Sequence, residues 1–93
     1  MSSNPLAWKV NFLLKARKQL ASLDQAAQKR ILKFLHERLL ASPDPRSLGK
    51  MLVGELEGLI RYRVGDYRLI CQLEDQALTI LVIEVGHRRE IYR

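Results

Sequence analysis

The sequence has little of what marks a secreted, membrane-bound or metal-binding protein. Its one cysteine, Cys71, excludes an internal disulfide, and its place in an apolar run is typical of a small core residue. No apolar run approaches the roughly 20 residues that span a bilayer, and residues 1–5 lack the basic and apolar regions of a signal peptide. No group of His, Cys, Asp and Glu has metal-ligand spacing. We therefore expect a cytoplasmic protein with no metal and no other cofactor.

The chain is rich in apolar residues and carries a net positive charge. Its 93 residues are 47% hydrophobic, enough for one folded domain over residues 1–93 with one sheet and a pair of helices. There are 16 Lys and Arg against 10 Asp and Glu, which gives a net charge of +6. This charge favours a polyanionic partner (a nucleic acid, a ribosome or an acidic protein), although a soluble basic domain without such a partner has the same composition.

The first half of the chain predicts one strand and two helices. Apolar and polar residues alternate over residues 8–12, which is the period of a strand. Apolar residues then recur at the spacing of one helix face over residues 16–23. Asp24 is suited to cap a second helix that runs to about Ala41, and Pro43 prevents its continuation. The short link between the two helices predicts an antiparallel helix hairpin.

The second half predicts three strands. Strand-like runs cover residues 59–64, 67–74 and 77–85. Gly65-Asp66 between the first two suits a type II′ turn, with glycine at its first central position, and Asp75-Gln76 is a weaker turn for the second hairpin. The order β-α-α-β-β-β predicts an α+β fold, in which an antiparallel helix hairpin packs on one face of a mainly antiparallel sheet.

The predicted two-residue turn determines which side chains share a face of the sheet. It places Arg63 opposite Arg68, and alternation puts both on one face with Arg61. The other face is almost wholly apolar, so the helices should cover it. The same alternation carries the arginine face along the last strand to His87. Opposed arginines are unfavourable unless an anion lies between them, which suggests a phosphate site, although an ordinary solvated face shows the same pattern. The arginine face also has an aliphatic end, which consists of Leu81, Ile83 and Val85. We predict that a protein partner covers it.

The segment Arg61–Arg68, together with the closing Gly86–Tyr92, resembles the RelE family of bacterial type II toxins within the wider RelE/ParE superfamily. The stretch Asp44–Lys50 and the order of elements are similar as well. The resemblance implies a ribosome-dependent endoribonuclease, or mRNA interferase, that cleaves mRNA in the ribosomal A site and stops translation. It also implies a cognate RelB-like antitoxin, an acidic protein with a DNA-binding dimer domain.

The resemblance assigns the chemistry to a small set of side chains. The implied reaction is attack of a ribose 2′-OH on the adjacent phosphate, with no metal ion. Arg68 and Arg61 match family positions that stabilise and bind the phosphate, and Arg88 matches an acid or electrostatic stabiliser. Tyr92 matches the catalytic tyrosine, which acts as the base or stacks on a nucleobase. His87 is the other candidate base, or else only an RNA contact.

Further basic residues are predicted to contact RNA without reacting. They are Arg63 on the hairpin and, on the second helix, Lys29, Arg30 and Lys33, although a solvated helix face explains the helix residues equally well. Two other functions stay open. One is a ParE-like, non-enzymatic inhibitor of DNA gyrase, against which the Gly-His-Arg-x-x-x-Tyr ending argues. The other is a decayed member that binds antitoxin or RNA without cutting.

Overall fold

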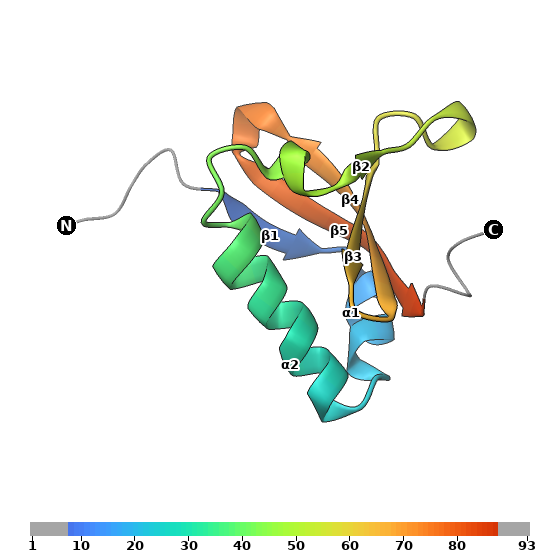
Figure 1. The fold of residues 1–93 in the computed structure, drawn as a ribbon. Helices are drawn as coiled ribbons and strands as arrows, with labels where there is room; N and C mark the ends of the chain where they lie inside the picture. Colours follow the sequence, from blue (N-terminus) through green and yellow to red (C-terminus); the bar gives the residue numbers. More distant parts are fainter. Residues whose placement is uncertain (1–7, 88–93) are drawn as a thin grey trace.

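The computed structural model describes residues 8–87, whose strands form one five-stranded sheet in the order β1-β5-β4-β3-β2. Strand β1 is parallel to β5, and the other neighbours are antiparallel. The strands are β1 (Lys9–Phe12), β2 (Lys50–Met51), β3 (Ile60–Val64), β4 (Tyr67–Glu74) and β5 (Thr79–His87). Helices α1 (Leu14–Ala21) and α2 (Gln25–Lys33) pack on this sheet, as Figure 1 shows. The predicted α+β fold, with a helix hairpin on a mainly antiparallel sheet, is confirmed.

The second helix begins and ends close to its predicted limits. The Asp24 side chain caps it by accepting a hydrogen bond from the Ala27 N–H at 2.8 Å. After α2 the helical path continues as a π-helical segment, Phe34–Leu39, and the Leu40 N–H donates to the Leu35 carbonyl at 3.0 Å. The combined helix therefore ends at about the position that the sequence predicts.

The core lies between the two helices and one face of the sheet. Its most enclosed members come from both layers: Ala16, Ile31, Leu35, Leu39, Ile60, Tyr62, Leu69, Ile80 and Val82. Cys71 belongs to this core, as predicted, and burial raises the pKa of its thiol to about 12. The face predicted to be apolar is thus the one that the helices cover. Within residues 8–87, neither helix is long and apolar enough to cross a membrane.

The β3–β4 hairpin has the predicted register, with Arg63 opposite Arg68. Gly65 has a φ of 59°, while Asp66 is not among the residues with positive φ, and this combination belongs to a type II′ turn. Because side chains alternate between faces, the turn places Arg61 on the same face as its two neighbours in the hairpin. Turn chemistry therefore decides which side of the sheet the arginines occupy.

Two local elements differ from the prediction. Strand β2 forms inside the segment expected to be a loop, because it pairs with the first residues of β3. The second hairpin turns through a 3-10 segment, Asp75–Ala77, and then through Leu78 with a φ of 48°, so that Glu74 lies opposite Thr79. The turn is two residues longer than predicted, and an even change leaves the faces of the next residues as expected.

A β-bulge interrupts the ladder between β4 and β5. Cys71 lies opposite Val82, whereas its neighbour Ile70 lies opposite Glu84. Ile83 is therefore the additional residue on β5. A single extra residue reverses the alternation of side chains for the rest of the strand.

The bulge corrects the predicted placement of the end of β5. Val85 lies opposite Leu69 and is 2% exposed in the core, rather than on the arginine face. His87 lies opposite Tyr67, with ring centroids 5.6 Å apart, and Tyr67 packs against the core. The prediction that His87 shares the face of the arginines is wrong. The predicted aliphatic patch is broken up as well, because Val85 has moved to the core.

A side chain of helix α1 bonds to the backbone of β5 beside the bulge. The Val85 N–H donates a hydrogen bond to Gln19 Oε1 at 2.8 Å, so a side chain takes the place of a strand carbonyl. Next to it, Lys15 Nζ lies 3.9 Å from Glu84 Oε1 in an exposed ion pair. Such exposed pairs contribute little to stability, about 0–1 kcal/mol. The Gln19 hydrogen bond is therefore the specific link between α1 and the irregular part of β5.

Candidate functional site

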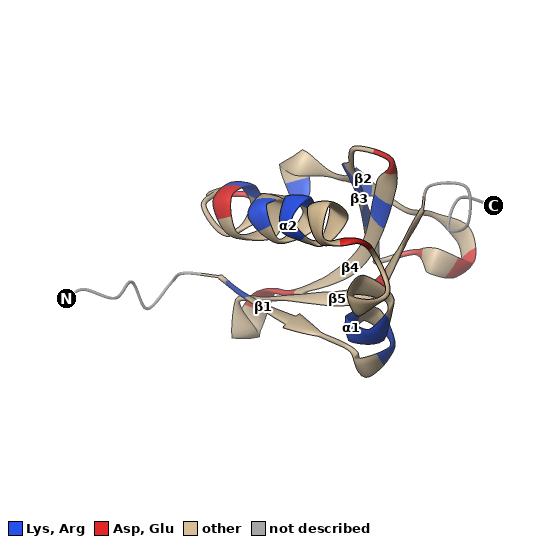
Figure 2. Cartoon of the chain, turned by 90° about the horizontal axis from the view of Figure 1, so that it is seen from below, with Lys and Arg blue, Asp and Glu red and all other residues tan. Residues whose placement is uncertain are grey.

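Four cationic side chains line one cleft beside the β2–β3 edge of the sheet, and we call it the cationic cleft. Its volume is about 230 Å³. It is lined by Leu48, Gly49, Lys50, Arg61, Arg63 and Arg68. Among residues 8–87, no Asp or Glu lines this cleft. Figure 2 shows basic segments on β2, β3 and α2.

Strand pairing brings the cations of the cleft together. Lys50 lies opposite Arg61 across β2 and β3, and Arg63 lies opposite Arg68 across β3 and β4. Opposed residues have Cβ atoms about 5 Å apart, and like charges in such pairs are unfavourable. Arg63 is exposed, whereas Arg68 is only 8% exposed, deep in the cleft. The cleft is therefore suited to an anion with several oxygens, such as a phosphodiester, which can accept hydrogen bonds from more than one of these donors.

The segment that leads into β2 packs closely against β3. A Cβ atom on Gly49 would lie 2.6 Å from Ile60 Cγ2 and 2.7 Å from Tyr62 Cε1, so only glycine permits this approach. The buried Tyr62 hydroxyl donates a hydrogen bond to the Pro45 carbonyl at 2.8 Å, which fixes the preceding 3-10 segment, Pro45–Leu48. Burial raises the pKa of Tyr62 far above its usual value, so the hydroxyl keeps the proton that it donates to Pro45. Together these contacts hold β2 against β3.

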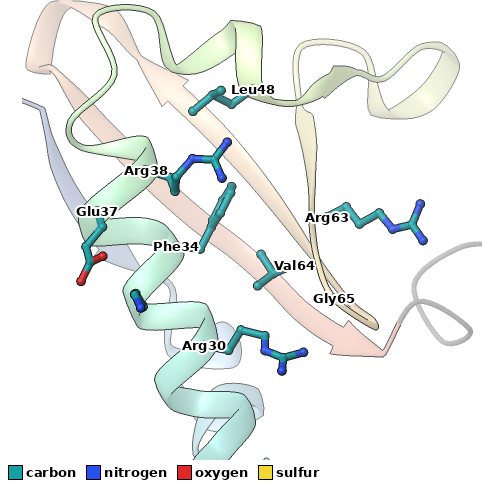
Figure 3. Close-up of a pocket in the computed structure, with 9 residues that line it drawn as sticks. Arg30, Phe34, Glu37, Arg38, Leu48, Arg63, Val64 and Gly65 are labelled. Atoms are coloured by element: carbon teal, nitrogen blue, oxygen red, sulfur yellow. The ribbon is translucent and has the colours of Figure 1, made fainter.

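A second hollow, the basic groove, lies between the second helix and β3, and Figure 3 shows it. Its volume is about 470 Å³. It is lined by Arg30, Lys33, Phe34, Glu37, Arg38, Leu48, Arg63, Val64 and Gly65. Leu48 and Arg63 also line the cationic cleft, so the two hollows adjoin each other.

The structure separates the predicted site residues into groups. Arg61, Arg63 and Arg68 come together in the cationic cleft, whereas His87 lies on the other face of the sheet. Arg88 and Tyr92 lie outside the described residues, and the three predicted helix residues are on α2. Of those three, the basic groove includes Arg30 and Lys33 and does not include Lys29, which is exposed. Within residues 8–87, no three His, Cys, Asp or Glu side chains are grouped as metal ligands.

Lys50 is the cleft residue that sequence reasoning missed. It is exposed, and it belongs to a strand of only two residues, which has no detectable period. The signal that the sequence does contain is the preceding Gly49, which allows the chain to approach β3 closely. A basic residue directly after such a glycine is a sensible candidate for a site on the same sheet.

The fold agrees with that of the toxins to which the chain is similar. An α+β domain of two helices on a mixed five-stranded sheet is the architecture of RelE toxin structures. Residues 10–92 match the family described as the ParE toxin of the type II toxin–antitoxin system, parDE. The chain belongs to this family of toxins, within the RelE/ParE superfamily.

Several known toxins are similar over nearly the whole chain. Toxin RelG of Mycobacterium tuberculosis is 33% identical over 88 residues, which cover 95% of this chain and 99% of RelG. The crystal structure of the RelBE2 toxin–antitoxin complex of the same organism matches with a TM-score of 0.81 and 29% identity, over 94% of this chain and 98% of that one. The archaeal RelE–RelB complex of Pyrococcus horikoshii matches with a TM-score of 0.67 and 29% identity, over 88% of this chain and 96% of that one.

Proposed function

We propose that this toxin is a ribosome-dependent endoribonuclease that cleaves mRNA in the ribosomal A site and so inhibits translation. The observation that carries the proposal is the cationic cleft, in which Lys50, Arg61, Arg63 and Arg68 converge. The similarity to toxins named RelG and RelE supports the same conclusion.

The proposed reaction breaks one phosphodiester bond. The ribose 2′-OH attacks the adjacent phosphorus while a base takes its proton, and the bond to the 5′ oxygen breaks as that oxygen gains a proton. The products are a 2′,3′-cyclic phosphate and a 5′-OH. Negative charge on the phosphoryl oxygens increases in the transition state, so cations already fixed around the phosphate lower the barrier.

The cleft geometry supports separate roles for its arginines. Arg68, the most enclosed cation, is assigned to transition-state stabilisation, and Arg61 to binding the same phosphate. By the family resemblance, Arg88 is the acid or electrostatic stabiliser, and Tyr92 is the base or stacks on a nucleobase. His87 lies beside Tyr67 on the opposite face, which favours an RNA contact over the role of base.

The remaining proposed contacts are with partners. Arg63, Lys29, Arg30 and Lys33 are assigned to the RNA backbone, where cations bind phosphates without reading sequence. By analogy with the RelB-bound relatives, we assign the toxin a RelB-like acidic antitoxin with a DNA-binding dimer domain. The proposed place of action is the cytoplasm, where ribosomes and messages meet.

Replacing Arg68 tests the proposed role of the cleft. Arg68→Ala should reduce the rate of mRNA cleavage by about 10²-fold or more, the usual cost of losing a charge-stabilising donor. Because Arg68 is nearly buried, the partly exposed Arg61 supplies a second variant, Arg61→Ala, which is less able to disturb folding. Arg17→Ala on the exposed side of α1 is the matched control. Full activity of both cleft variants would contradict the assignment.

Inhibition of DNA gyrase, the ParE-like function, is the second candidate, because the family that the chain matches carries the name of the ParE toxin. The two functions differ in what stops first after the toxin is expressed. The proposed ribonuclease stops protein synthesis and leaves new 5′ ends in ribosome-bound messages. A gyrase inhibitor stops DNA synthesis first and leaves messages intact, and that outcome would replace the proposed function.

A further inference from the structure

Strand β2 covers only the first part of β3. Their pairing ends at Lys50 and Arg61, and the same register would place Leu48 opposite Arg63. Leu48 instead belongs to the preceding 3-10 segment, in which the chain does not have the conformation of a strand. Within residues 8–87, no strand residue therefore lies opposite Arg63 on this side, and the last part of β3 is an open edge of the sheet.

The backbone of Arg63 directs its polar groups toward this open edge. In a two-residue hairpin the residues that flank the turn form a hydrogen-bonded pair, here Val64 and Tyr67. Bonded and non-bonded pairs alternate along an antiparallel ladder, so the N–H and C=O of Arg63 point away from β4. The Leu52 N–H donates to the Leu59 carbonyl at 3.0 Å, which fits this alternation, because Leu59 and Arg63 are an even number of positions apart. We call the N–H and C=O of Arg63 the open rung.

The open rung borders the basic groove. Arg63, Val64 and Gly65 line this groove on the side of the sheet. Figure 3 shows that the Arg63 side chain extends away from the second helix, so it is the main chain of this residue that faces the groove. Arg63 also lines the cationic cleft. One residue therefore connects the proposed phosphate site with a neighbouring hollow of about 470 Å³, in which the sheet fixes a donor and an acceptor.

We propose that the open rung binds the edge of one nucleobase of the RNA whose phosphate occupies the cationic cleft. The inference rests on the proposed function, because it adds a base contact to the same substrate. Single-stranded RNA is read through hydrogen bonds to the edges of its bases. A main-chain rung provides one donor and one acceptor, and it binds a base that presents the complementary pair. Arg63 thereby contributes to specificity as well as to binding of the RNA backbone.

The chemistry of the rung predicts which bases it distinguishes. Adenine and cytosine present an exocyclic amino donor beside a ring nitrogen that accepts. Guanine and uracil present an exocyclic oxygen beside a ring N–H, so the order of donor and acceptor is reversed. Because the sheet fixes the order on the protein, a base held in one orientation satisfies the rung in only one of these two classes. The other class leaves a donor facing a donor and an acceptor facing an acceptor.

The surroundings of the rung favour a base over an added peptide strand. Arg63 is the last outward residue before the turn, because Gly65 has a φ of 59° and no longer has the conformation of a strand. A peptide strand would gain a single rung here, whereas strand addition to a sheet edge depends on main-chain hydrogen bonds along an extended segment. Glu37, also in the lining, points away from the groove (Figure 3). The cations of the lining suit phosphates on either side of the base, and they are Arg30, Lys33 and Arg38.

The contact is tested with the wild-type toxin and RNA that it cannot cleave. The probes are 2′-O-methyl trinucleotides of adenine, cytosine or uracil, which are titrated into nitrogen-15-labelled toxin while the backbone amide signals are recorded. The Arg63 amide proton should move downfield when the matching class of base binds. The affinities for the two amino bases and for uracil should differ about fivefold, the usual effect of one hydrogen bond. An Arg63 amide that none of the three probes moves would overturn the proposal.

Two substitutions separate the open rung from the side chain of Arg63. Arg63→Ala and Arg63→Pro both remove the guanidinium, but only proline removes the N–H. Proline is tolerated on a sheet edge where the N–H points outward, and urea unfolding checks that both variants fold. Both should bind all three probes more weakly, but Arg63→Ala should keep the difference between the bases and Arg63→Pro should lose it. A folded proline variant that keeps the preference would contradict the assignment.

The binding measurement is independent of cleavage. A toxin that shows the Arg63 response and cuts no message would refute the proposed reaction and leave the base contact standing. A toxin that cuts messages while the Arg63 amide stays unmoved would refute only the base contact. If a protein partner protects this amide from hydrogen exchange and the three probes do not, the open edge accepts a peptide strand and the proposal fails.

Discussion

Lys50 offers a test of the cleft at the scale of one residue. It lies opposite Arg61 and lines the cationic cleft. Loss of one charge-assisted hydrogen bond to phosphate costs about 1.5 kcal/mol or more, and 1.4 kcal/mol is about tenfold in rate. Lys50→Ala should therefore slow single-turnover cleavage about tenfold, while Lys18→Ala on α1 should not. Equal rates for the two variants would remove Lys50 from the site.

Tyr62 links a buried hydroxyl to the pH dependence of stability. Burial raises the pKa of Tyr62 in the folded state, so the neutral phenol stabilises the fold at every pH below its ordinary value near 10. That stability is lost as the pH rises from there toward the folded pKa. Tyr62→Phe should cost about 1 kcal/mol at pH 7, because the Pro45 carbonyl loses its donor. The variant should also lose less stability than the wild type between about pH 10 and 11, as measured by urea unfolding, and parallel pH profiles would contradict this reading.

The residues of the site were predictable to different degrees. The sequence placed Arg61, Arg63 and Arg68 correctly, because a two-residue turn and strict alternation determine their face. It placed His87 wrongly, because alternation cannot be continued through an unseen bulge. Lys50 was missed since its partner lies across a strand too short to have a pattern.

Strand β5 is the element in which sequence reasoning failed. The run over residues 79–85 is almost wholly apolar, so alternation does not mark Ile83 as an extra residue. The Val85 N–H beside the bulge donates its hydrogen bond to Gln19 Oε1, and Gln19 is 66 positions away along the chain. By contrast, the β3–β4 hairpin was predictable because its turn signal is local. Contacts between residues this far apart in the chain cannot be predicted from a single sequence.

Replacing Gln19 tests whether α1 holds the bulge. Gln19→Ala removes the acceptor for the Val85 N–H, which should cost about 1 kcal/mol and speed hydrogen exchange of that amide about fivefold. Gln19→Glu keeps an acceptor oxygen and should restore protection. Gln28→Ala is the matched control, since its side chain bonds to Ala21 and Leu23 rather than to β5. Unchanged exchange at Val85 in Gln19→Ala would show that the ladder alone fixes the bulge.

The whole molecule combines a predictable scaffold with a less predictable surface. Helix periodicity, the Asp24 cap and one well-defined turn were enough for the α+β fold, because each depends on neighbours in the sequence. The basic groove was not predictable. It requires Arg30, Arg38 and Leu48, from two separate segments, to meet beside β3. Basic side chains from the second helix, β2, β3 and β4 thus gather in two adjoining hollows, of which the cationic cleft is suited to phosphate.

The most direct test of the central claim is primer extension on a defined message in a translation extract, with and without ribosomes. We predict new 5′ ends within codons at the ribosomal A site, which appear only when ribosomes are present and which are lost with Arg68→Ala. Intact message in the presence of active toxin and translating ribosomes would contradict the claim, as would equal cutting of the same RNA without ribosomes.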